Sequence, residues 1–131
     1  MSKRKKLHNN HKIKNNMKMS EIIAEYSGDF VSCGSDLYEK QNNLNCACTA
    51  WNISLFPKIE IKQKINSVVA DYEKNNPGTD DSDNLRYNLE QLIKRKLELY
   101  PDIKKSIVRA VIENDHGSKN RITVVSMALD Q

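Results

Sequence analysis

The chain contains no long apolar run, few glycines and prolines, and few aromatic side chains. None of its segments approaches the roughly 18 consecutive apolar residues that a membrane-spanning helix requires, so we expect no contact with a membrane. Its 4 glycines stand singly, which excludes the glycine-rich loops that cradle phosphate groups. The sequence also lacks Gly-x-Ser-x-Gly, His-Glu-x-x-His and any readable pair of catalytic carboxylates. We therefore predict no catalytic residue and no cofactor.

Cysteine is scarce as well, and the 3 that are present, Cys33, Cys46 and Cys48, are too few and too oddly spaced for a disulfide framework. Cys46 and Cys48 lie in a predicted helix at positions that point to different faces, so a bridge between them would be strained. We also expect no export of the protein, because the basic residues at the N-terminus are followed by His, Asn and Lys instead of the apolar segment of a secretory signal. Both observations predict reduced thiols and a cytoplasmic protein.

The cysteines allow a second interpretation, in which they supply zinc ligands together with a histidine. The four candidate ligands are Cys33, Cys46, Cys48 and His116. Structural zinc sites usually place ligand pairs roughly two to four residues apart on a turn. Here the Cys-Ala-Cys sequence lies in an apolar helix close to Trp51, and free cysteine is commonly buried as a small apolar residue. Packing in the core is the favoured interpretation, with a metal site or a Cys–His nucleophile as the alternatives.

Positive charge is concentrated at the N-terminus. The whole chain has a formal net charge of +4, yet residues 1–18 contain no acidic residue. The basic residues of this segment are Lys3, Arg4, Lys5, Lys6, Lys12, Lys14 and Lys18. The rest of the chain is therefore slightly acidic, with a net charge of −3. Because the segment has few apolar residues and no periodicity, we predict a disordered basic arm at 1–18 ahead of a single domain at 19–131.

The basic arm supports a nucleic-acid hypothesis, because its charges would neutralise backbone phosphates in a sequence-independent and salt-sensitive manner. It carries no aromatic residue that would stack on bases. The alternative is a solvated tail, or translated leader sequence ahead of a true start at Met17 or Met19 rather than Met1. The abundance of Asn, Lys and Ile, whose codons are AT-rich, indicates a low-GC bacterium or a mobile element.

The middle of the chain has the periodicity of amphipathic helices. Apolar residues recur every three to four positions in the segments 37–56, 57–75 and 85–100. Asp36 followed by Glu39 resembles a capping box at the start of the first segment. The half of this helix from Leu44 onward is apolar on both faces, so it should be the most buried element. The first stripe consists of Leu37, Gln41, Leu44, Cys48, Trp51 and Leu55, and the third of Leu85, Leu89, Leu92, Ile93, Leu97 and Tyr100.

Residues 20–33 fit two kinds of structure. A short helix capped by Ser20 agrees with their apolar pattern, whereas the segment 21–26 also fits a strand that ends at Gly28. Helix is the favoured interpretation.

The C-terminal segment changes to the period of β-strands. Residues 107–112 are rich in β-branched side chains, 115–120 favour a turn, and 122–129 form a second strand, which together predict a β-hairpin. The final strand carries no charge, and an exposed uncharged edge strand promotes aggregation. We therefore expect helices over one face of it and a pairing partner at its free edge, either the 22–26 segment or a neighbouring molecule. The residues of this interaction strand are Ile122, Val124, Val125, Met127 and Leu129.

These patterns predict an α+β domain with three to four helices packed against a small antiparallel sheet built on the C-terminal hairpin. The leading functional hypothesis is a non-enzymatic protein-interaction module, a regulator or adaptor that binds a protein partner or a second copy of itself through the C-terminal strand. The alternatives are a nucleic-acid-associated protein that uses the basic arm, and a small enzyme or metal protein that uses the cysteines.

Overall fold

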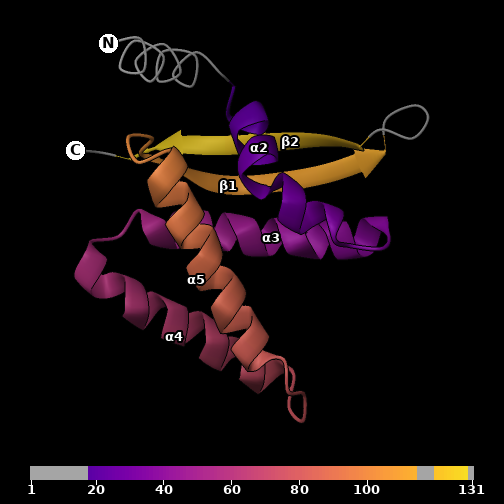
Figure 1. Ribbon diagram of the computed structural model, residues 1–131, viewed down its shortest axis with the longest axis vertical. Coiled ribbons are helices and arrows are strands. Elements are labelled where there is room, and N and C mark those ends of the chain that lie inside the picture. Colours follow the sequence, from indigo (N-terminus) through magenta and orange to yellow (C-terminus); the bar gives the residue numbers. More distant parts are fainter. Residues whose placement is uncertain (1–17, 115–119, 130–131) are drawn as a thin grey trace, which may run out of the picture.

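The computed structural model describes residues 18–114 and 120–129. The elements of these residues are α2 (Met19–Ser32), α3 (Leu37–Ser54), α4 (Lys58–Asn75), α5 (Ser82–Leu99), β1 (Lys105–Asn114) and β2 (Asn120–Ala128). The strands pair as an antiparallel hairpin, α2 and α3 pack against it, and α4 lies away from it (Figure 1). The α+β architecture that the sequence predicts is confirmed.

The segment that fits either a helix or a strand is helical. Helix α2 begins at Met19 with Lys18 in the N-cap position, so both the strand alternative and the predicted cap at Ser20 are wrong. Its buried positions are Ile22, Ile23, Tyr26, Ser27 and Val31. They recur with the period of a helix, because the segment buries a stripe against α3 rather than alternate residues against a sheet.

Helix α3 is the central element, as its two apolar faces predict. The Asp36 carboxylate accepts a hydrogen bond from the Glu39 backbone N–H at 2.8 Å and so caps the helix. The reciprocal bond differs from a capping box, because Glu39 Oε1 accepts from the backbone N–H of Ser35. The helix ends at Ser54, shortly before the predicted end at Phe56. Its completely buried residues are Leu44, Ala47, Ala50 and Trp51.

Three aromatic rings join α2, α3 and the end of α5. Tyr26 meets Trp51 edge to face, with ring centroids 5.2 Å apart, and Tyr100 lies 6.0 Å from Trp51. The Tyr26 hydroxyl donates a hydrogen bond to the Ala47 carbonyl at 2.8 Å, which satisfies its polar atom inside the core. Burial raises the pKa of this phenol far above its ordinary value. Trp51 is therefore the residue on which the packing of three elements depends.

The apolar stripes of the last two helices are buried only in part. In α4, only Ile65 and Val69 are buried. In α5, Leu97 is 41% exposed, so its predicted place in the core is wrong. Lys96 occupies the core position instead, with its side chain fully buried. The helical period explains why Lys96 rather than Leu97 is buried, because Lys96 follows buried Leu92 by one turn and lies on the same face of α5.

The predicted hairpin is confirmed, and its register runs without a gap except at one β-bulge. The bulge lies between Ile107 and Arg109 and adds Val108 to β1. The inward side of β1 is buried at Ile107, Ala110 and Ile112. Most of the predicted turn at 115–120 lies outside the described residues.

Candidate interaction surface

The hairpin has two outer edges that differ in what covers them. In an antiparallel strand, the backbone groups of alternate residues point toward the partner strand, and those of the residues between point away. No third strand pairs with the hairpin within residues 18–114 and 120–129. Each strand therefore has one outer edge, and an uncovered outer edge is a template for another chain.

Side chains of α3 occupy the outer edge of β1. Asn52 binds both backbone groups of Ile107, since its Nδ2 donates to the carbonyl at 2.9 Å and its Oδ1 accepts from the N–H at 2.7 Å. Farther along, Gln41 Nε2 donates to the Ala110 carbonyl and its Oε1 accepts from the Ile112 N–H, both at 3.0 Å. Two side-chain amides thus take the place of a neighbouring strand, and we call this the closed edge (107–112).

The spacing of the two amides matches the strand. Gln41 and Asn52 are 11 residues apart. This separation is about three helical turns, so the two side chains lie on one face of α3, roughly 16 Å apart along its axis. The segment 107–112 covers about 16 Å of extended chain. Next to Asn52, the Trp51 Nε1 donates to the Lys105 carbonyl at 2.7 Å and extends the cover to the start of β1.

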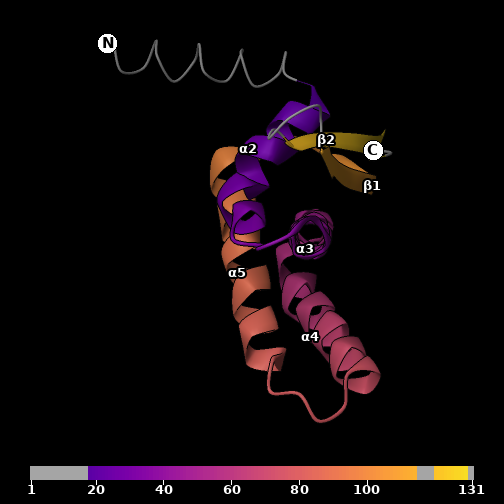
Figure 2. The same ribbon diagram turned by 90° about the vertical axis from the view of Figure 1, so that its right-hand side faces the viewer.

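Among residues 18–114 and 120–129, no side chain covers the outer edge of β2 in this way. The residues of β1 that face α3 have cross-strand partners whose backbone groups point to the opposite side, away from β1. These partners are Ile122, Val124 and Ser126. Helix α2 crosses the hairpin and packs against β2, but it contributes no strand (Figures 1 and 2). We call this the open edge (122–126).

Exposed apolar side chains lie beside the open edge. The outer face of the hairpin exposes Val108 by 60%, Val125 by 53%, Met127 by 59% and Leu129 by 38%. Val125 and Met127 alternate along one face of β2, and Leu129 follows at the same spacing just after the strand. Val108 is the extra residue at the bulge of β1. A cluster of this kind, unlike single exposed apolar residues, is typical of a surface that another molecule covers.

The predicted interaction strand divides between two faces. Ile122 and Val124 are half-buried and pack against the core, whereas Val125, Met127 and Leu129 are exposed. The expected helical cover over one face is therefore present. The 22–26 segment cannot pair with the free edge, because it is helical. The partner at that edge stays a prediction.

The cysteines lie in different surroundings. Cys48 is buried, Cys46 is half-buried, and Cys33 is exposed at the end of α2. Burial raises the pKa of the Cys46 thiol to about 11 and that of Cys48 to about 12, so both stay protonated near neutrality. Among the described residues, no group of three metal-ligating side chains is close enough to hold an ion. His116, the remaining candidate, lies outside them.

Lys96 is the unusual group that the sequence analysis missed. Its Nζ donates to the Ile103 carbonyl at 2.9 Å and lies 4.9 Å from the centre of the Trp51 ring. Desolvation on burial, with the charge of nearby Lys104, lowers the pKa of this amine to about 8. The sequence does contain an indication, since Lys96 falls on the apolar stripe, but a charged residue there is easily assigned to the surface. Its contacts support Trp51 and the chain after α5.

Of the basic arm, only Lys18 belongs to the described residues, where it is exposed just before α2. The other basic residues of the arm lie outside them, so the nucleic-acid hypothesis stays a prediction. In the part of the chain that the structure describes, no helix is long and apolar enough to cross a membrane. Comparison of the chain with family models, with curated proteins and with solved structures gave no match. The surfaces of the molecule itself are therefore the basis from which we infer its function.

Proposed function

We propose that this protein is a non-enzymatic interaction module, a regulator or adaptor, that works as a two-fold dimer joined through its β2 strands. The observation that supports this proposal is the contrast between the edges of the hairpin. The closed edge is occupied by Gln41 and Asn52, whereas the open edge is uncharged and unpaired within the described residues. An edge left in this state favours addition of a strand from another chain.

The geometry of β2 suits pairing with itself. The midpoint of Asn120–Ala128 is Val124, whose backbone groups point to the open edge. A two-fold axis at Val124 overlaps the two strands completely and sets Ile122 opposite Ser126 of the second copy. Within the open edge (122–126), three facing pairs would exchange two backbone hydrogen bonds each, about six in total. The result is one four-stranded sheet without either open edge.

Charge favours a second copy as the partner. Residues 122–129 carry no charge, so pairing would desolvate no ionised side chain. Arg121, the one charged residue of β2, would lie opposite Met127 of the second copy rather than opposite its own counterpart. The same patch then serves both subunits, which is the usual geometry of a two-fold interface.

The substitution Ser126→Pro tests the proposal. It removes an N–H that points to the open edge and leaves the hydrogen bonds between β1 and β2 in place. We expect light scattering after size-exclusion chromatography to report a dimer for the wild-type chain and a monomer for the variant. Circular dichroism checks that the variant is folded. A wild-type chain that stays monomeric at concentrations of about 1 mM, well above the range of specific dimers, would refute the proposal.

The register is tested at Met127, which is 59% exposed and so tolerates substitution in the monomer. In the proposed dimer, Met127→Lys places a positive charge opposite Arg121 of the second copy, and Met127→Glu places a negative one there. We expect the lysine variant to dimerise about 10-fold more weakly than the glutamate variant, because the contact occurs twice. Equal dimerisation of the two variants would rule out this register.

A further inference from the structure

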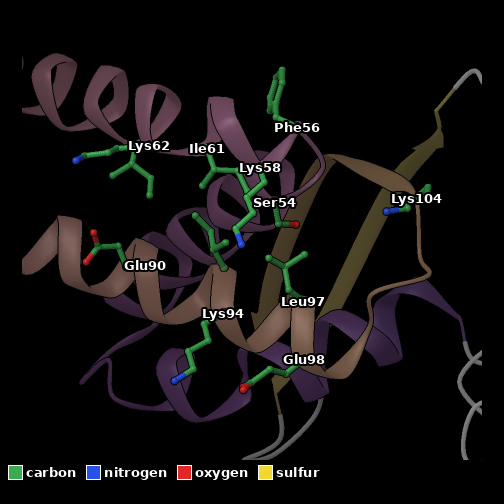
Figure 3. Close-up of a pocket in the computed structure, with 12 residues that line it drawn as sticks. Ser54, Phe56, Lys58, Ile61, Lys62, Glu90, Lys94, Leu97, Glu98 and Lys104 are labelled. Atoms are coloured by element: carbon green, nitrogen blue, oxygen red, sulfur yellow. The ribbon is translucent and has the colours of Figure 1, made fainter.

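A groove of about 900 Å³ lies between α4 and α5, and none of the residues that line it belongs to β2 (Figure 3). Ser54, at the end of α3, also lines it. The principal residues of its two walls are Lys58, Ile61 and Lys62 from α4, and Glu90, Lys94 and Leu97 from α5. The groove is therefore a second surface, separate from the open edge.

The floor of the groove is apolar. Ile65 and Ile93 form its buried part, each only 5% exposed, and Ile61 above them is half-buried. At the rim, Leu97 remains 41% exposed and Phe56 remains 42% exposed. A molecule that fills the groove would cover Leu97, and removal of this side chain from water would contribute to binding. The Phe56 ring points away from the other labelled residues and lies 4.5 Å from Lys64 Nζ (Figure 3).

The rim of the groove is positively charged on one side. Lys58 and Lys62 line it from α4, and no acidic residue of α4 does so. Lys104 adds a further positive charge at the end nearer the sheet. On the α5 side the charges are mixed, because Lys94 lies between Glu90 and Glu98. The potential along the α4 side thus favours an acidic partner.

We propose that this groove binds an amphipathic helix of a partner protein, with its apolar face on the floor and acidic residues along the flank beside Lys58 and Lys62. Both walls are helices, whose interior backbone groups bond within α4 and α5, so they present no strand edge along which an extended segment could pair. A helix satisfies its own backbone and presents one apolar face, so it suits a groove of this kind. The proposal does not depend on dimerisation through β2.

Two synthetic helical peptides of roughly 15 residues, stapled to remove the cost of helix formation, provide the probe. Both carry leucine at i, i+4 and i+7, and their remaining positions are mainly glutamate in one and lysine in the other. We expect fluorescence anisotropy to give a Kd about 10-fold lower for the glutamate peptide at low salt. The difference should shrink as the salt concentration rises, because exposed charges are screened.

Variants locate the binding. Leu97→Gln should weaken the glutamate peptide about 10-fold, whereas Ile59→Gln, at an 87% exposed position of α4 outside the groove, should leave its Kd unchanged. The double variant Lys58→Glu, Lys62→Glu should reverse the preference toward the lysine peptide. Lys74→Glu, on the same helix but away from the groove, is the control for a charge reversal outside it and should leave the preference unchanged.

Several results would overturn the proposal. One is equal affinity for the two peptides, and another is binding that Leu97→Gln does not weaken although circular dichroism shows the variant folded. A third is binding of myristate, an anionic amphiphile with a single chain, in a manner sensitive to Leu97→Gln while the glutamate peptide does not bind. Ser126→Pro should bind the glutamate peptide as the wild type does, so failure of the dimer and failure of the groove are separate outcomes.

Discussion

The two outer edges of the hairpin have the same backbone chemistry but different surroundings. At the closed edge, two amide side chains and one indole of α3 provide the hydrogen bonds that a neighbouring strand would provide. At the open edge, no strand of the described residues does so, and no side chain there is charged. Natural sheets usually protect such an edge with lysine, proline or a covering element. The fold therefore closes one edge itself, and we propose that a second copy of the chain pairs with the other.

The largest effect in this comparison should come from Asn52→Leu. It removes two hydrogen bonds from the closed edge and leaves the N–H and carbonyl of Ile107 without their partner. We expect the free energy of unfolding to fall by about 3 kcal/mol, measured by urea denaturation. The variant should also aggregate more readily, since both edges are then open.

The control for this variant is Asn42→Leu, which makes the same change at an exposed position of α3. It should alter stability by less than about 0.5 kcal/mol. Gln41→Leu should cost about 1.5 kcal/mol, and its effect should add to that of Asn52→Leu, because the two sites lie three helical turns apart. Similar costs for Asn42→Leu and Asn52→Leu would mean that the amide bonds do not stabilise the closed edge.

A smaller effect concerns Lys96, which supports Trp51 behind the closed edge. The pKa of its amine is lowered from 10.5 to about 8 in the folded state. Below pH 8 the folded and the unfolded chain both carry the charged amine, so the folded state bears the full free-energy cost of burying that charge. Between pH 8 and 10.5 the unfolded chain binds more protons, and stability rises with pH. We expect the wild-type chain to gain about 1–2 kcal/mol relative to Lys96→Met across this range.

The comparison with Lys96→Met isolates the amine. The buried thiols of Cys46 and Cys48 and the phenol of Tyr26 have raised pKa values, so they lower stability as the pH rises, but they do so in both proteins. Urea denaturation at several pH values between 7.5 and 10.5 measures the difference, within about the range over which lysine titrates in the two states. A constant difference between wild type and variant would contradict the assignment.

The smallest expected effect is read from the native cysteines, whose rates of chemical labelling report how often the core around α3 opens. Iodoacetamide should label exposed Cys33 at least roughly 100-fold faster than Cys48, because Cys48 is buried and its pKa is raised to about 12. Mass spectrometry of peptides gives the rates. In Asn52→Leu, labelling of Cys48 should accelerate as α3 separates more often from β1. Equal labelling of the two cysteines in the native protein would contradict their placement.

The sequence predicts the elements better than the contacts that distinguish the edges. The helices α3, α4 and α5 and the hairpin follow from periodicity, whereas the pattern of residues 20–33 fits a helix or a strand. Spacing alone puts Gln41 on the apolar stripe of α3. That this amide binds Ala110 and Ile112 depends on how α3 lies along β1, which no local pattern reveals. The burial of Lys96 cannot be predicted from the sequence for a related reason, since the tertiary neighbours of a charged residue decide whether it is buried. The uncharged residues 122–129 predict an edge in need of a partner, but no sequence pattern indicates which molecule pairs with it.

The most direct test of the open edge is amide hydrogen exchange of β2, followed by NMR at low and high protein concentration. The amides of Thr123 and Val125 point toward β1 and should exchange slowly at both concentrations. The amides of Ile122, Val124 and Ser126 should exchange rapidly in dilute protein and become protected in concentrated protein, as the second copy pairs with them. Rapid exchange of these three amides at every concentration would contradict the account.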